Sequence, residues 1–378
     1  MTVRAFAPEA CPVREKFAAT RRELSESLIE RDGEVDLVLT ALVAREHVLL
    51  VGPPGGAKSL LLDSLMNWMH GRKFSVLLNR FTTPEEVLGP ISVAGLKADV
   101  YRRVTAGKLP EADLAFLDEV FKASSAILNV LLKILNERTH EVGDGTSIRV
   151  PLKLCVAAGN EWPSPETGKE LAALFDRFCL RKSVRPVLTR AGRDRLLWHD
   201  DLTPKLSTSI TPAEVDLAHE QAMRLPWSGE AREAAESILR ELAKEGIQPG
   251  DRRQRKSVGV ARAFAWLYGA DRVEPEHLEV PAHVLWDSPE EQPEKVASVI
   301  ARIANPTGMR LNQLLLECEG ILSSTDVRNL AQAATATAKL QEIDKRLGAL
   351  RADGRVGRAR AYVKERVREI RLGSIDSL

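Results

Sequence analysis

The spacing of apolar positions changes along the chain and divides it into regions of different expected structure. Between Arg14 and Val43 apolar residues recur at helical spacing, with a break at Asp32 and Gly33, which predicts two helices. Short and almost continuous apolar runs follow, at 47–51, 74–78, 114–117, 154–158 and 178–184. Such runs, separated by helical segments, are typical of buried parallel strands in an α/β layer fold. We therefore expect residues 1–185 to form an α/β core with a parallel sheet and a helical lead.

The strand-like runs stop near Pro186, and the remainder of the chain has helical periodicity. Segments 230–244 and 256–268 show it clearly, so residues 186–288 are predicted to form a smaller helical domain. Residues 287–293 contain two prolines and three acids, a composition typical of a linker. Residues 289–378 are then expected to be a C-terminal helical extension, with a turn between its two long final helices at Asp353 and Gly354.

Composition narrows the class of protein. The 378 residues suggest two or three domains, and 54 basic against 53 acidic residues give a net charge of only +1, which excludes a global attraction to nucleic acid or anionic lipid. The four cysteines form no C-x-x-C pair, so neither a disulfide framework nor a zinc cage is indicated. Without a long apolar run or a signal-like N-terminus, a cytoplasmic protein without membrane insertion is expected.

The strongest local motif is a Gly-rich turn between an apolar run and a helix, the context that a phosphate-binding loop requires. Glycines let the backbone amides point at phosphate groups, and the following helix adds its positive N-terminal end. The pattern G-x-x-x-x-G-K-S expects glycine at position 57, where this chain has alanine. A nucleotide-binding role is predicted for Gly52, Pro53, Pro54, Gly55, Gly56, Ala57, Lys58, Ser59 and Leu60. An ordinary turn before a helix is the alternative interpretation.

Two acids close the apolar run that begins at Leu114. Strand ends are where an α/β sheet places its ligand, so Asp118 and Glu119 are candidates for phosphate chemistry. Asp118 and the Ser59 hydroxyl would hold Mg²⁺, and Glu119 would polarise the attacking water as a general base. Such a pair alone is more often a solvated edge or a helix cap, and the upstream loop favours the functional interpretation.

These motifs, with the segments around them, closely resemble the MoxR family of AAA+ ATPases, and within it the RavA branch. The resemblance is carried by 52–59, 80–90, 109–112, 116–123, 126–129, 135–138 and 156–161, and Ala57 is itself usual in that family. It implies ATP and Mg²⁺ as cofactors, an AAA+ αβα core with a helical lid, and ATP hydrolysis by a ring, most often a hexamer.

The resemblance also implies roles for residues beyond the phosphate loop. Asn160 matches the first sensor, which helps to position the hydrolytic water, although a turn asparagine is the plainer interpretation. Arg177 matches the finger that reaches a neighbouring subunit's γ-phosphate, with Arg181 as the alternative, and either could be a surface ion-pair residue. Arg252 matches the second sensor from the lid, where an arginine reaches the same nucleotide, with Arg253 as the alternative.

Two predicted β-hairpins, 89–104 and 140–151, match insertions that face the central pore in similar proteins, although ordinary surface hairpins are almost as well supported. The expected activity is remodelling of a client protein, with a von Willebrand factor A domain protein as a partner implied by resemblance. A nucleic-acid motor of a restriction or defence system is the rival interpretation; it would need a basic, aromatic-bearing pore. Basic residues between Arg351 and Arg371 could bind an acidic partner, but a solvated helix face is the more common use.

Overall fold

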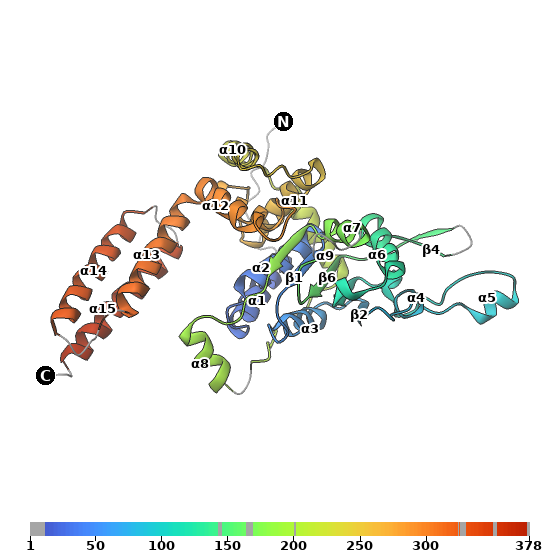
Figure 1. Ribbon diagram of the computed structural model, residues 1–378, viewed down its shortest axis with the longest axis horizontal. Coiled ribbons are helices and arrows are strands. Elements are labelled where there is room, and N and C mark those ends of the chain that lie inside the picture. Colours follow the sequence, from blue (N-terminus) through green and yellow to red (C-terminus); the bar gives the residue numbers. More distant parts are fainter. Residues whose placement is uncertain are drawn as a thin grey trace. The chain divides into compact units, whose positions relative to one another are not determined.

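The computed structural model describes residues 12–142, 146–163, 169–199, 202–323, 325, 330–350 and 354–375. The chain divides into two compact units, residues 1–297 and 298–378 (Figure 1). The three-domain division expected from the sequence, with boundaries at 185 and 288, stays a prediction.

A five-stranded parallel sheet, in the order β2-β3-β6-β1-β7, forms the centre of the first unit. Its strands are β1 (Val48–Val51), β2 (Lys73–Leu77), β3 (Leu114–Asp118), β6 (Leu154–Gly159) and β7 (Leu180–Ser183). They coincide with the five apolar runs. Strands β1 and β6 are buried along their whole length, which explains why their sequences are apolar without alternation. The predicted α/β fold with a parallel sheet is confirmed.

Helices connect the strands and cover the sheet. Helix α3 (Lys58–Trp68) follows β1, helix α6 (Ser125–Glu137) follows β3 through the 3₁₀ turn η2 (Val120–Lys122), and α7 (Lys169–Arg177) follows β6. The N-terminal lead forms α1 (Pro12–Ser27) and α2 (Asp32–Ala44), the two helices that the apolar spacing predicts. Helix α2 packs on β1, β6 and β7.

The lid helices share an apolar interior with this core. They are α9 (Pro212–Met223), α10 (Gly229–Lys244) and α11 (Asp251–Leu267), with the 3₁₀ segment η3 (Pro275–His283). Thr211 and Ser228 cap the first turns of α9 and α10 through their hydroxyl oxygens, the local signal that starts these helices. Phe17 of α1 makes edge contacts with Trp68 of α3 and Trp266 of α11, so one aromatic cluster joins lead, core and lid. Helix α8 (Arg190–Trp198) lies between core and lid in the sequence.

Two segments extend from the sheet on the same side of the molecule (Figure 1). One is the predicted hairpin at 140–151, which is confirmed as the antiparallel pair β4 (Thr139–Glu141) and β5 (Ser147–Arg149). Residues 143–145, its predicted turn, lie outside the described part of the chain.

The other segment, 89–104, was predicted to be a β-hairpin, and this prediction is wrong. It begins after α4 (Pro84–Leu88) and has one antiparallel bridge, Ile91 with Arg103, around the short helix α5 (Val93–Lys97). The Ser92 hydroxyl accepts a hydrogen bond from the Gly95 amide at 3.1 Å and starts that helix. A cap of this kind competes locally with strand pairing, which explains the difference. The 3₁₀ turn η1 (Leu109–Glu111) then leads into β3.

The second unit is helical. Helix α12 (Gln292–Ala304) crosses the boundary at residue 297, and α13 (Pro306–Ser323), α14 (Leu330–Gly348) and α15 (Gly354–Ile375) follow. Apolar residues from α13, α14 and α15, among them Leu314, Leu340 and Val363, form one buried cluster. Helix α14 ends before the predicted turn at Asp353 and Gly354, and α15 begins at Gly354. Asp353 itself lies outside the described residues.

Candidate phosphate-binding site

The Gly-rich turn lies between β1 and α3, as the sequence predicts. Gly52 must be glycine, because a β-carbon there would lie 2.3 Å from the carbonyl oxygen of Val184. Gly55 has a φ of +78°, which also favours glycine. Ala57 has a φ of +60°, a left-handed conformation that costs an alanine about 1–2 kcal/mol. The local geometry therefore explains why the general motif has glycine at this position.

Lys58 opens helix α3 and bends back over the loop. Its Nζ donates hydrogen bonds to the carbonyl oxygens of Gly52 at 2.5 Å and Pro53 at 3.0 Å, and the residue is only 9% exposed. Burial lowers the pKa of the Lys58 ammonium, and the charges of Asp118 and Glu119 oppose that lowering. Ser59, next on the helix, is exposed.

The acid pair and the predicted sensor meet at the carboxyl ends of β3 and β6. The Glu119 amide donates to the Asp118 carboxylate at 2.9 Å, and Glu119 itself has a φ of +53°. The Asn160 side-chain amide donates to one oxygen of the Glu119 carboxylate, while Lys122 forms an ion pair with the other at 3.2 Å. A non-glycine residue in left-handed geometry, held by two partners, is the kind of strain that functional sites contain.

Asp118, Glu119 and Asn160 are joined by these hydrogen bonds at one edge of the sheet, and Lys58 lies near enough for its ammonium to interact with the charges of Asp118 and Glu119. The edge is the expected one, because the carboxyl ends of parallel strands lie together there. Its chemistry suits a nucleotide phosphate: loop amides, a helix N-terminus and one ammonium could bind the anion. A carboxylate and a hydroxyl could hold Mg²⁺, which usually takes few protein ligands beside phosphate oxygens.

Arg31 is a residue of this site that the sequence did not reveal. It lies between α1 and α2, is only 5% exposed, and donates from Nε to the Gly56 carbonyl oxygen at 3.0 Å. A cavity of about 550 Å³ adjoins it, lined by 30–34, 181–183 and 282–283 among others. That volume is in the range of small-ligand sites. In the sequence, the only signal for Arg31 is its place in the charged break between the two predicted N-terminal helices.

The two candidates for the arginine finger differ sharply in their surroundings. Arg177 ends α7, is partly exposed, and pairs with Asp176 at 3.1 Å. Arg181 is 0% exposed, lies against the rings of Phe175 and Trp286, and donates to the Trp286 carbonyl oxygen. Burial lowers the pKa of the Arg181 guanidinium to about 9. This geometry leaves Arg177 as the candidate that a neighbouring molecule could reach.

The predicted second sensor lies beside Arg177 and contacts none of the loop residues. Arg252 donates to the Asn136 side chain at 2.8 Å and pairs with Asp176 at 3.6 Å. Arg253, the alternative, is 6% exposed and pairs with Asp176 at 2.6 Å and Asp287 at 2.9 Å. The structure does not bring either arginine to Lys58, so the sensor role stays a prediction.

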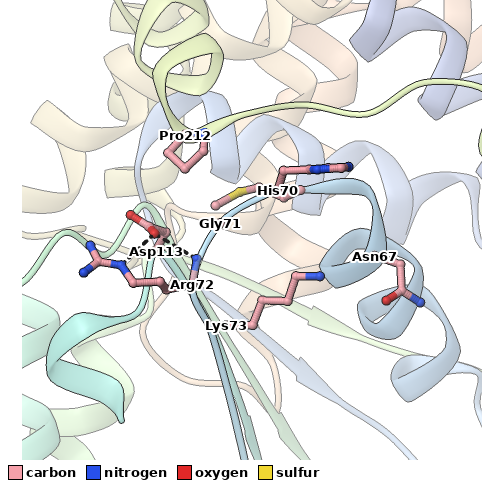
Figure 2. Close-up of a pocket in the computed structure, with 8 residues that line it drawn as sticks. Asn67, His70, Gly71, Arg72, Lys73, Asp113 and Pro212 are labelled. Carbon is pink, nitrogen blue, oxygen red and sulfur yellow. Dashed lines mark hydrogen bonds and ion pairs between the residues drawn. The ribbon is translucent and has the colours of Figure 1, made fainter. Parts of the chain in front are cut away.

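A further cavity, of about 510 Å³, lies at the opposite edge of the sheet (Figure 2). Lys73 begins β2 there, and Asp113 precedes β3. The Asp113 carboxylate accepts hydrogen bonds from the Arg72 amide at 3.0 Å and its Nε at 3.4 Å. Because the carboxylate is satisfied and the cavity is at the amino ends of the strands, it is no part of the phosphate site.

Within the described ranges, the side-chain clusters and the helices bear on metal binding and on membrane insertion. In those ranges no group of three or more His, Cys, Asp or Glu residues is arranged to hold a metal ion. None of the helices there is long and apolar enough to cross a membrane.

Comparison with known proteins adds to this geometry. Residues 15–216 match the profile of the MoxR domain in MoxR-vWA-beta-propeller ternary systems, and residues 233–300 match the AAA lid domain. One uncharacterized protein of Methanocaldococcus jannaschii is 38% identical over 287 residues, covering 75% of each chain. Another is 34% identical over 358 residues, covering 93% of this chain and 92% of its own.

More distant proteins extend the likeness. Protein MoxR of Methylorubrum extorquens is 25% identical over 311 residues, covering 73% of this chain and 89% of its own. Among solved structures, a candidate ATPase from Cytophaga hutchinsonii superposes with a TM-score of 0.62 at 17% identity, covering 78% of this chain and 95% of that one. At this identity the superposition shows the fold alone.

Proposed function

Because this chain belongs to the MoxR family of AAA+ ATPases, we propose that it binds ATP with Mg²⁺, hydrolyses it, and uses the energy to remodel a client protein. The observation that carries the proposal is the meeting of Lys58, Asp118, Glu119 and Asn160 at one edge of the sheet. The phosphate loop alone would support only binding. The carboxylate held beside it supports hydrolysis.

The residues divide the chemistry between them. The loop amides and Lys58 bind the phosphates, and the cavity beside Arg31 accepts the nucleoside. Ser59 and Asp118 would hold Mg²⁺, which neutralises phosphate charge when bound. Glu119 accepts the proton of the attacking water, and the Asn160 amide fixes the orientation of its carboxylate.

Arg177 is assigned to the site of a neighbouring subunit, because it stands on α7 beside Asp176 rather than at its own phosphate loop. A guanidinium that stabilises the transition-state charge raises NTPase rates by about 10³- to 10⁵-fold. This arrangement requires a ring of identical subunits, and a hexamer is the expected size.

The client is expected to contact the two segments that extend from the sheet. Apolar side chains are exposed there, including Val93, Leu96 and Tyr101 on the α5 segment and Ile148 on β5. Exposed apolar side chains suit an unfolded or partly unfolded polypeptide better than a phosphate backbone. This favours protein remodelling over the rival nucleic-acid motor.

The partner proposed is a von Willebrand factor A domain protein, because the matched MoxR domain is described from systems that contain one. The proposal also includes membership of the RavA branch and a location in the cytoplasm.

Phosphate release with Mg²⁺ and ATP is the direct test. Wild-type protein should turn over, and Glu119→Gln should bind ATP but release no phosphate, since only the water-activating carboxylate is lost. Stimulation of the rate by an unfolded protein, but not by single-stranded or duplex DNA, is expected. Stimulation by DNA alone would favour the rival motor.

A further inference from the structure

Asp176 is the meeting point of three arginines from two parts of the first unit. Its carboxylate pairs with Arg177 of the same helix at 3.1 Å, and with Arg252 and Arg253 of lid helix α11 at 3.6 and 2.6 Å. The two contacts with α11 link residues that are more than seventy positions apart. Asp176 itself is about half exposed, at 47% for the side chain.

Of the three arginines, Arg253 is the buried one, and its contacts are those of a structural anchor. Besides Asp176, its guanidinium reaches Asp287 at 2.9 Å and the Val284 carbonyl oxygen at 3.3 Å. Five N–H groups on one guanidinium can serve these acceptors together. Arg253 therefore connects α7 with the segment that follows η3 and stabilises their packing.

Arg177 and Arg252 occupy a different position, because both approach the same oxygen, Oδ2 of Asp176. Their side chains are 25% and 43% exposed, against 7% for Arg253. Two guanidinium groups so close together repel each other unless an anion lies between them. The Asp176 carboxylate supplies that anion and leaves further N–H donors on both groups.

We propose that Asp176 is a positioning residue that holds Arg177 and Arg252 as one pair of cations, presented to the phosphates of ATP in the neighbouring subunit. The inference rests on the proposed function, in which Arg177 acts on that neighbour. It adds that one carboxylate, that of Asp176, holds the finger and the lid arginine together and sets the distance between them. Paired guanidinium groups suit the several oxygens of a terminal phosphate.

Asp176→Asn is the variant that tests the proposal, because it keeps the shape of the side chain and removes its charge. Misplacement of a catalytic group by about 1 Å can cost about 100-fold in rate, so a fall in kcat of about 10- to 100-fold is expected. KM and the affinity for ATP should stay near wild type, since Lys58 and the loop are untouched. Asp176→Glu, which restores the charge, should recover part of kcat.

Asp287→Asn is the matched control. It removes a carboxylate from Arg253 but leaves the contacts of Arg177 and Arg252 with Asp176 in place. It should lower the melting temperature much as Asp176→Asn does, yet keep kcat near wild type. An equal loss of kcat in both variants would mean that Asp176 is only a structural support, and would overturn the proposal.

Mixed rings locate the defect. An Asp176→Asn subunit keeps its own Glu119, and a Glu119→Gln neighbour keeps its own arginine pair, so mixing the two inactive proteins should restore phosphate release. The double variant Asp176→Asn/Arg177→Ala should be no slower than Arg177→Ala alone, because the two changes disable one unit.

The outcomes separate this inference from the proposed function. If Arg177→Ala is complemented by Glu119→Gln but Asp176→Asn is not, or if the double variant shows additive losses, the positioning role is wrong and the finger assignment stands. Full activity of Arg177→Ala would refute the finger and this inference together. Absence of ATP hydrolysis by the wild-type protein would refute the proposed function itself.

Discussion

Replacement of Lys58 by alanine should remove most of the affinity for ATP without unfolding the protein. In the structure, the ammonium bridges the Gly52 and Pro53 carbonyl oxygens and lies near the charges of Asp118 and Glu119. Phosphate groups bound by the loop would compete for the same ammonium. The variant removes that cation while every loop amide remains.

The size of the effect follows from burial. Loss of one partner from a buried, hydrogen-bonded charge pair costs about 2–5 kcal/mol. At about 1.4 kcal/mol for each tenfold change, the dissociation constant for ATP should rise by about 30-fold to several thousand-fold. The fold loses two hydrogen bonds from a charged donor to backbone carbonyls, each worth about 1.5–3 kcal/mol, but it also no longer has to desolvate the buried ammonium, and alanine is a good helix former. A small change in melting temperature is therefore expected.

Titration of a fluorescent ATP analogue, in the presence of Mg²⁺, measures the affinity directly. Glu119→Gln is the control, because it should bind as tightly as wild type and differ only in turnover. Circular dichroism on all three proteins verifies that the variants are folded. A folded Lys58→Ala protein that binds the analogue as tightly as wild type would refute the assignment of the phosphate loop.

Three further predictions concern assembly and buried groups. The ATPase rate per chain should rise with protein concentration, because each site needs Arg177 of a neighbour; a constant rate in a protein shown by sedimentation to stay monomeric would contradict this. Arg181→Ala should lower the free energy of unfolding by about 2–4 kcal/mol, because it empties the space beside Trp286. Any ATPase activity that the Arg181→Ala variant loses should not be restored by mixing it with Glu119→Gln subunits. Restored activity would identify Arg181 as the finger. Burial raises the pKa of the Cys179 thiol to about 12, so this cysteine should resist an aromatic disulfide reagent near pH 8 in the native state and react after denaturation; rapid native labelling would show that its surroundings open.

The sequence by itself determined the elements whose signals are local. Strands β1 and β6 are short apolar runs because they are buried on both faces, and a run of that kind is visible without knowledge of its neighbours. The phosphate loop is equally local, since glycine, lysine and a helix start within one turn define it. The acid pair was identifiable from its place at the end of such a run.

Local signals were not enough where two conformations compete. The segment 89–104 has the composition of a hairpin, yet a serine cap starts a short helix within it. The choice depends on a single side-chain hydrogen bond and on the packing around it. The pattern of residues alone does not show whether the hairpin or the helix has the lower free energy.

Only the tertiary structure decided which distant side chains meet. It placed Arg31 on the Gly56 carbonyl oxygen, and Arg252 on Asp176 beside Arg177. It also buried Arg181, the residue that the sequence left open as the alternative to Arg177 for the finger. Such contacts depend on how helices and strands far apart in the chain pack together, and the spacing of residues along one segment carries no information about that packing.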